Sequence, residues 1–453
     1  MPDFLPGYAS RETTLNILLE QEADGAFLKD LFPRYSQPLP PADRAWVREA
    51  AFGVIRNRTL LDFNLDRCTP RKMGPGILRM ALRLSAYQLF FMDVPAHAAV
   101  HLGVELIKGR CDERRAHFAN AVLKRLASEG LQLFSGETLE AMAVNYSDPL
   151  WLINRWRRRL GAPGLLRALE RNNQEAPLWI RVNPFRAEPE KLREELSRSG
   201  IETDSDAHAP LFLRLRHGGE KALHSPAFAA GKMAFQDPAA WLVAELVDWR
   251  PHQTFIDLCS APGGKAACIL ERARYRGDLV DKTPIPLTCN DISFRRLRRI
   301  ADATGRLGHG GLSPLVMDPA RPALRHVFDI VLVDAPCSNL GVLRRRPEAK
   351  WRWNRDAKDL QRLAALQKNL LGQAASLAGI GGRIVYATCS PEDEETWEVV
   401  KAFLEAHPGW ALEDAAARLP GWAVKRKCLW LYPGETEYDG FFAASLLRWK
   451  ASP

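Results

Sequence analysis

Apolar positions in roughly the first 130 residues recur every three or four residues, as on the buried face of an α-helix. Gly130 follows the last periodic stretch, where a glycine commonly ends a helix. These stretches predict an all-α bundle over residues 1–132, and they cover residues 13–28, 42–65, 76–92, 97–110 and 115–130.

The pattern changes between residues 133 and 240. Helical pieces at 139–146 and 149–161 precede short strand-like runs at 178–183 and 211–215, and a helix is predicted at 189–200. This mixture indicates a small α+β subdomain.

From residue 241 to 453 the pattern alternates between apolar strands and helices. Such alternation is typical of an α/β domain with a parallel sheet covered on both faces, where ligands bind beyond the carboxyl ends of the strands. The predicted strands are 254–259, 286–291, 314–318, 329–336 and 382–390. At or just after their ends lie Cys259, Asp291, Asp318, Asp334, Cys337 and Cys389. We therefore expect a multidomain protein with its chemistry in the last domain.

Charge and composition indicate which classes of protein and partner fit the sequence. The 453 residues carry a formal net charge of +9, which is compatible with a polyanionic partner, and basic clusters occur at 156–160, 295–299 and 343–347. A charge run is usually a solvated helix face, so the clusters alone decide little. We find no apolar run long enough to span a membrane and no secretory signal, and we expect a cytoplasmic protein. The absence of coiled-coil heptads favours a monomer.

Eight cysteines are scattered along the chain without CxxC pairs or zinc-ligand spacing, so no metal site is predicted. In a reducing compartment most free cysteines are simply small buried apolar groups. The cysteines stand at positions 68, 111, 259, 268, 289, 337, 389 and 428.

The segment 255–270 predicts a strand, a tight turn with Gly263 and Gly264, and a helix. Glycines there let backbone N–H groups approach a ligand, and the helix N-terminus favours an anionic group. The spacing matches neither the dinucleotide fingerprint nor the phosphate loop, and a purely structural turn stays possible. Asp291 is placed to bind ribose hydroxyls and Asp318 to border an adenine, although either residue could instead cap a helix.

Several motifs together resemble the Sun (RsmB-like) family of RNA cytosine-5 methyltransferases. They are CSAPGGK at 259–265, DAPCSNLGVLRRRPEAKW at 334–351 and YATCS at 386–390, with Asp291 and Asp318 between them. The resemblance implies a Rossmann-like methyltransferase domain at 241–453, preceded by the family's α+β subdomain. It also implies that the first bundle is a NusB-like RNA-binding domain.

The resemblance also assigns roles to residues. Cys389 of the TCS motif would be the nucleophile, Cys337 of the PC motif would assist breakdown of the covalent adduct, and Asp334 would bind the cytosine edge. S-adenosyl-L-methionine would be surrounded by Cys259, Ser260, Ala261, Pro262, Gly263, Gly264, Lys265, Asp291, Asp318 and Asp334.

The chemistry of cytosine agrees with these roles. The C5 carbon is too weak a nucleophile to take a methyl group unaided, and a thiolate that adds to C6 activates it. A group at N3 must stabilise the developing charge, and the C5 proton must leave before the thiol is eliminated. The DNA enzymes use the cysteine of the PC motif as nucleophile instead, so the order of the two roles is testable.

The resemblance implies an RNA substrate, ribosomal RNA of the small subunit first, with transfer RNA as the alternative. Arg344, Arg345, Arg346 and Lys350, with Lys265, are expected along the RNA path. Two features depart from the family pattern. Asn339 replaces a usually small residue and could alter base or loop contacts, and the stretch 272–285 could replace a regular helix.

Two readings from other classes compete with this one. An RNA-binding or antitermination-type assembly factor would keep the bundle and carry an inactive methyltransferase domain, which the paired cysteines and the glycine loop argue against. A methyltransferase acting on DNA or protein is the other. Enzymes for protein or adenine amino groups need no cysteine nucleophile, whereas the choice of RNA over DNA rests on the resemblance.

Overall fold

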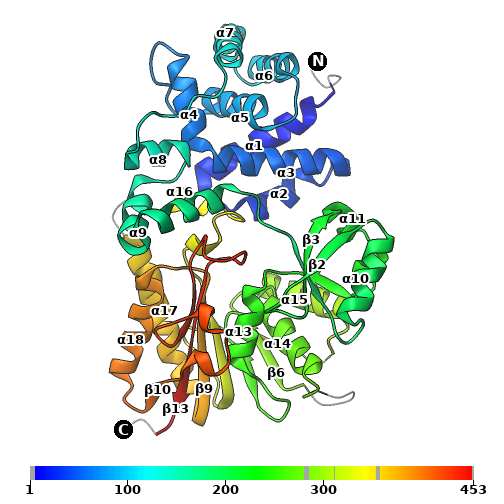
Figure 1. The fold of residues 1–453 in the computed structure, drawn as a ribbon, viewed down its shortest axis with the longest axis vertical. Helices are drawn as coiled ribbons and strands as arrows, with labels where there is room; N and C mark the ends of the chain where they lie inside the picture. Colours follow the sequence, from blue (N-terminus) through cyan, green and yellow to red (C-terminus); the bar gives the residue numbers. More distant parts are fainter. Residues whose placement is uncertain (1–5, 280–284, 311, 354–357, 451–453) are drawn as a thin grey trace. The chain divides into compact units, whose positions relative to one another are not determined.

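The computed structural model describes residues 6–279, 285–310, 312–353 and 358–450 (Figure 1). The chain forms two compact units. The first comprises residues 1–175 and 343–355, and the second comprises residues 176–342 and 356–453. The expected boundaries at 132 and 240 stay predictions. In the described part of the chain, no helix is both long and apolar enough to cross a bilayer.

The first unit is helical, as its apolar periodicity predicts. Gly130 ends α7 as expected: its φ of 67° is left-handed, and its N–H donates to the carbonyl of Leu126. The helices are α1 (Tyr8–Asp24), α2 (Leu28–Ser36), α3 (Pro41–Arg56), α4 (Arg58–Arg67), α5 (Ile77–Phe91), α6 (Ala96–Arg110), α7 (Glu113–Glu129), α8 (Leu139–Asn145), α9 (Leu150–Asn173) and the short α16 (Ala349–Arg352).

Helix α16 comes from far along the chain and belongs to this helical unit. Its segment is held by hydrogen bonds to the bundle: the Arg56 guanidinium donates to the Arg344 carbonyl at 3.0 Å, and the Trp351 indole donates to the Ile55 carbonyl at 3.0 Å. The backbone N–H of Leu28 donates to the Glu348 carboxylate at 3.2 Å. Residues 343–353 therefore complete the bundle, although they follow directly on the DAPC motif.

The second unit begins with a four-stranded antiparallel sheet in the order β2-β3-β1-β4. The expected strands and helix are confirmed as β1 (Trp179–Val182), β3 (Phe212–His217) and α10 (Pro189–Arg198). The short strands β2 (Glu202–Ser205) and β4 (Met233–Phe235) were not predicted. Two short helices follow β3, α11 (Gly219–Leu223) and α12 (Pro226–Ala229).

The larger sheet of this unit has the order β11-β12-β13-β9-β8-β5-β6-β7, and β10 pairs with β13. All five predicted strands are present and mutually parallel, and β13 runs antiparallel to β9. The strands are β5 (Phe255–Asp257), β6 (Leu287–Asp291), β7 (Leu312–Val316), β8 (Phe328–Asp334), β9 (Ala378–Thr388), β10 (Trp410–Leu412), β11 (Val424–Lys425), β12 (Cys428–Leu431) and β13 (Phe441–Arg448). The helices are α13 (Ala239–Val247), α14 (Gly264–Tyr275), α15 (Phe294–Leu307), α17 (Lys358–Leu377) and α18 (Trp397–Ala406).

Both faces of the central strands are buried, which explains their continuous apolar sequence. On β8, Ile330 and Leu332 pack into the core that includes α13 and α14, whereas Val331 and Val333 face the core that includes α17 and α18. Helix α14 continues to Tyr275, so the first part of the 272–285 stretch is regular helix, and residues 280–284 lie outside the described part.

Candidate active site

The order of strands reverses between β5 and β8, so the chain leaves these neighbouring strands in opposite directions. In open α/β sheets such a reversal opens a crevice beyond the carboxyl ends of the strands, and ligands bind there. The 258–263 loop follows β5, Asp334 ends β8 and Cys389 follows β9. The sheet topology thus brings the predicted motifs to one edge.

The loop after β5 depends on a glycine. Gly263 has a φ of 92°, and a Cβ there would meet Ile300 at 3.0 Å, so a side chain would be both strained and crowded. The Gly263 N–H donates to the Ser260 carbonyl at 2.6 Å, and α14 begins at the next residue. The turn presents the first backbone N–H groups of α14 at the crevice.

Three ionisable groups meet behind this loop. The Lys265 ammonium donates to the Asp334 carboxylate at 2.6 Å and lies 4.8 Å from the Phe441 ring centre. Burial lowers the pKa of Lys265, but the charge and hydrogen bond of Asp334, together with the charges of Cys389 and Asp257, outweigh burial and raise that pKa. Asp257 is buried, and burial together with the charge of Asp334 raises its pKa to about 7.

Asp257 was not predicted as a site residue. Its position inside the apolar strand 254–259 was the available signal, because a carboxylate is rarely buried without a partner. One carboxylate oxygen accepts from the Cys259 N–H at 3.2 Å, and the other has no hydrogen-bond partner among the described residues. The site therefore holds more negative charge than Lys265 alone offsets.

Asp291 ends β6 as expected. It is buried, accepts from the Ser293 N–H at 2.8 Å and pairs with Arg296 at 2.7 Å. Asp318 is exposed two residues beyond β7 and accepts from the Ala320 N–H at 2.9 Å. Both carboxylates thus order their own turns, and neither is the N-cap residue of a helix.

A cavity of about 470 Å³ reaches Lys265 and Asp334. It is also lined by the 260–264 loop, by β4 and by α15, with the cationic side chains of Arg181, Arg299 and Arg306. Neither Asp291, Asp318 nor the two motif cysteines are among its lining residues. The cavity therefore approaches the site from the side of the small sheet.

The two motif cysteines form a close pair. The Sγ atoms of Cys337 and Cys389 lie 3.0 Å apart as free, partly exposed thiols. The hydrogen bond to Cys389 and burial raise the pKa of Cys337 well above its usual range. Cys337 is therefore a protonated thiol at neutral pH, in position to donate to the neighbouring sulfur.

The structure explains why an asparagine can stand at position 339, where the family usually has a small residue. Its φ of 64° is left-handed, a conformation that asparagine adopts more readily than most residues. Its amide donates to the Cys337 carbonyl at 3.0 Å, and its side-chain oxygen accepts from the Cys389 thiol at 3.3 Å. The residue therefore contacts the loops of both cysteines.

A buried carboxylate, which the sequence analysis missed, lies behind the cysteines. Glu395 accepts hydrogen bonds from the N–H and hydroxyl of Ser338 and from the hydroxyl of Ser390, the residues that follow Cys337 and Cys389. It also accepts from Gln367 at 3.0 Å, and burial raises its pKa. The sequence alone does not distinguish Glu395 from the other acidic residues of the 392–395 run. Its hydrogen-bond partners in the structure do.

Known proteins are similar to this chain along nearly its whole length. Three family models match: the NusB family at residues 8–128, the RsmF/B-like ferredoxin-like domain at 148–220, and the 16S rRNA methyltransferase RsmB/F at 244–447. A probable ribosomal RNA small subunit methyltransferase B of Bacillus subtilis (strain 168) is 30% identical, over 97% of this chain and 98% of its own length. The chain belongs to the RsmB/F family of rRNA methyltransferases.

Two further comparisons agree. A ribosomal RNA small subunit methyltransferase B of Xylella fastidiosa (strain 9a5c) is 34% identical, over 90% of this chain and 92% of its own length. The crystal structure of PH0851 has a TM-score of 0.80 at 24% identity, covering 98% of this chain and 99% of that one. The predicted family and multidomain fold, with a NusB-like bundle, a small domain and a methyltransferase domain, are confirmed.

One expectation taken from the RsmB/F resemblance is wrong in part. Lys350 is only 1% exposed, pairs with Asp148 and donates to the Arg56 carbonyl, and Arg344 is only 4% exposed. Neither side chain is available to RNA phosphates, because both lie inside the helical unit. Arg345 and Arg346 are half-buried, and their place on the RNA path stays a prediction.

Proposed function

We propose that this chain transfers a methyl group from S-adenosyl-L-methionine to C5 of a cytosine in RNA, through a covalent adduct between a cysteine and C6. The observation that carries the proposal is the pair of thiols 3.0 Å apart at the edge of the sheet where β8 and β9 end. We propose small-subunit ribosomal RNA as the substrate, because the curated relatives named above are called small-subunit ribosomal RNA methyltransferases.

Cys389 is the proposed nucleophile. Its thiolate forms the S–C6 bond, and the displaced electron pair moves into the ring toward N3 and C5. Asp334 holds the base edge near N3, and the charge of Lys265 at 2.6 Å steadies that carboxylate. The hydrogen bond to Cys389 and burial raise the pKa of Cys337, so its thiol keeps a proton that it can donate to a thiolate at Cys389.

Cys337 is proposed to act in product release. After methylation the C5 proton passes to solvent, its electron pair restores the C5–C6 double bond, and the S–C6 bond breaks. The Cys337 thiol, 3.0 Å from the departing sulfur, stabilises the returning thiolate by hydrogen bonding. Without this thiol the adduct should persist.

The residues around the 259–265 loop fit S-adenosyl-L-methionine, which when bound supplies the methyl group. The cofactor carries a cationic sulfonium and an ammonium, and the site holds the buried carboxylates of Asp257 and Asp291 together with Asp334. One oxygen of Asp257 and the hydroxyl of Ser260 are buried and have no hydrogen-bond partner among the described residues beyond what they can offer each other, which suits such a ligand. Asp291 suits the ribose hydroxyls, and Asp318 is proposed beside the adenine.

Methyl transfer from labelled S-adenosyl-L-methionine to undermodified ribosomal RNA and to transfer RNA tests the proposal. We expect wild type to label cytosine, Cys389→Ala to lose activity at least a thousandfold because no adduct forms, and Cys337→Ala to accumulate a covalent protein–RNA complex. Cys111→Ala, which replaces a partly exposed thiol of the helical unit, is the matched control and should behave as wild type.

Each outcome bears on a separate part of the proposal. Full activity of Cys389→Ala would refute the covalent mechanism, and an adduct trapped through Cys337 would reverse the two roles. Labelling of transfer RNA alone would move the substrate away from ribosomal RNA. If no RNA is labelled, the interpretation as an RNA-binding assembly factor becomes the better one.

A further inference from the structure

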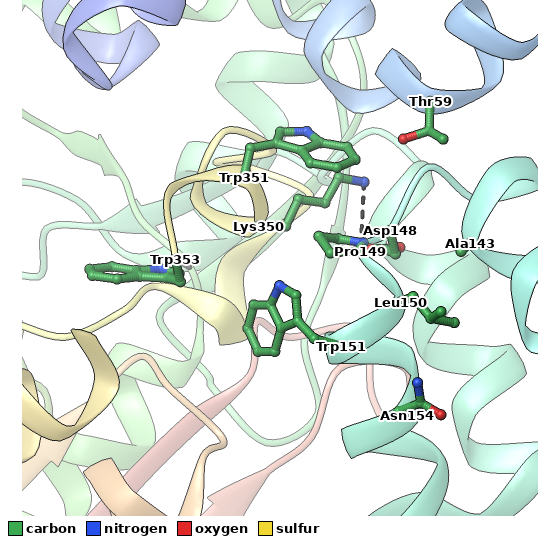
Figure 2. A pocket seen from close by; sticks show the side chains of 10 residues that line it. All are labelled: Thr59, Ala143, Asp148, Pro149, Leu150, Trp151, Asn154, Lys350, Trp351 and Trp353. Carbon is green, nitrogen blue, oxygen red and sulfur yellow. Dashed lines mark ion pairs between the residues drawn. The ribbon is translucent and has the colours of Figure 1, made fainter. Parts of the chain in front are cut away.

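The helical unit contains a second cavity of about 670 Å³ that the proposed reaction does not use (Figure 2). Most of its walls come from two parts of the chain that are distant in sequence, and Thr59 of α4 adds to them. Helix α9 and the residues before it form one wall, and the segment at α16 forms another. The lining residues are Thr59, Ala143, Asp148, Pro149, Leu150, Trp151, Asn154, Lys350, Trp351 and Trp353.

Three of the lining residues are tryptophans, and Figure 2 shows their indole rings around Lys350 and Pro149. All three side chains are partly exposed. The Trp351 ring is fixed by its hydrogen bond to the Ile55 carbonyl, and the Arg58 guanidinium lies 5.3 Å from its centre. Partly exposed, fixed aromatic rings in a cavity are suited to stacking a flat ligand.

The polar part of the wall offers an acceptor. Asp148 is buried and pairs through one oxygen with the Lys350 ammonium at 3.4 Å, while its other oxygen has no hydrogen-bond partner in the described part of the chain. A buried acceptor without a donor is unfavourable, so a ligand that brings an N–H group would satisfy it. The amino group of a nucleobase is such a donor.

The charge around the cavity identifies the class of ligand. The run from 155 to 159 on α9 contains four arginines and no acidic residue, and the segment 343–353 adds Arg345, Arg346 and Arg352 beside the buried Arg344 and Lys350. Arg157, Arg158 and Arg352 are exposed. Basic side chains that flank an aromatic cavity suit a polyanion with planar bases, whereas an apolar peptide would gain nothing from them.

We propose that this cavity binds one unpaired, amino-bearing base of an RNA strand, stacked against Trp151 and the tryptophans of the 343–353 segment. The flanking arginines bind the phosphates on either side of that base. The identity of the RNA as the methylation substrate rests on the proposed function, but the base site itself does not. It would anchor the substrate at a nucleotide other than the reacting cytosine.

The test uses the full chain and a twelve-nucleotide single strand of uridines with one central 2-aminopurine, a fluorescent amino-bearing base that is quenched on stacking. We expect wild type to bind the strand and quench its fluorescence. Trp151→Ala should relieve the quenching and weaken binding by about 5–150-fold, the range that corresponds to about 1–3 kcal/mol for one stacked base. Trp151→Phe should retain most of the quenching.

Trp449→Ala removes an exposed tryptophan of the other unit and is the matched control, expected to match wild type. Trp353→Ala gives a second variant if Trp151→Ala does not fold. Binding by wild type without quenching, or unchanged quenching in both cavity variants, would overturn the inference. In the methylation assay the loss should appear in KM for RNA rather than in kcat. If quenching is seen but no RNA is methylated, the base site stands and the proposed function fails.

Discussion

Two lysine–aspartate pairs, one in each unit, show how differently the same residue types are used. Lys265 and Asp334 lie 2.6 Å apart in the crevice of the sheet, and their side chains keep 17% and 29% exposure. Lys350 and Asp148 lie 3.4 Å apart in the helical unit with almost none. The pKa of Lys265 is raised, because Asp334, Cys389 and Asp257 together outweigh burial, whereas burial lowers the pKa of Lys350.

The difference follows from what surrounds each pair. The pair in the crevice still reaches solvent, as the proposed contact of Asp334 with a substrate base requires. The pair in the bundle holds the 343–353 segment in place, and its charges are costly to separate. One pair is suited to chemistry and the other to attachment.

Removal of one partner from each pair tests this difference with the largest expected effect. Asp148→Ala leaves an unpaired buried ammonium and should reduce the unfolding free energy of the helical unit by about 3–5 kcal/mol. The matched change Asp334→Ala should cost on the order of 1 kcal/mol, because its partner is not fully buried. Calorimetric melting of both variants measures this, and equal shifts would contradict the distinction.

The pH dependence of the unfolding free energy tests the ionisation of Asp257 in the crevice. The pKa of Asp257 is about 7 in the folded protein, above its unfolded value near 3.9, so the folded state holds this proton more tightly. The stability from the protonated form is complete below pH ~4 and is lost as pH rises to about 7. Asp257→Asn should remove this loss, at most about 4 kcal/mol.

Melting temperatures of wild type and Asp257→Asn at pH 4.5 and pH 7.5 provide the measurement. The advantage of the variant should grow with pH across this window. A constant difference between the two proteins would mean that Asp257 ionises normally. Asp302→Asn, on the exposed face of α15, is the control and should show no such trend.

The smallest effect is expected at Glu395, a buried carboxylate without a lysine. Glu395→Gln keeps the volume but introduces a donor among four donors, so both cysteine loops should lose their common anchor. We expect adduct formation with RNA to slow by about 10–100-fold, comparable to loss of one positioning interaction. Glu395→Asp should recover part of the rate, and Glu394→Gln is the neighbouring control.

The fold was largely predictable because its signals are local. Four of the five parallel strands are apolar runs that end in polar residues, and the helices repeat every three to four residues, so these elements were visible in a short window. Strand β2 was missed because its four residues, Glu202–Ser205, include no apolar position. Strand β4 is the three-residue segment Met233–Phe235, which shows no alternation of its own.

The candidate site was predictable where a motif carries it. The cysteines at 337 and 389, the glycine turn and Asp334 all lie at the carboxyl ends of strands β5, β8 and β9, on either side of the switch point. Asp257 and Glu395 escaped because one lies within an apolar strand and the other within an acidic run. Their role depends on burial and on partners that are distant in sequence.

The sequence by itself determined the family, the parallel sheet and the identity of the motif residues, since all three depend on residue type and short spacing. Only the tertiary structure decided that Cys337 and Cys389, 52 positions apart, touch, and that one carboxylate holds both loops. It also decided that Lys350 and Arg344 are buried in the helical unit. A basic residue has the same letter whether it faces phosphates or an aspartate, and long-range packing alone makes that choice.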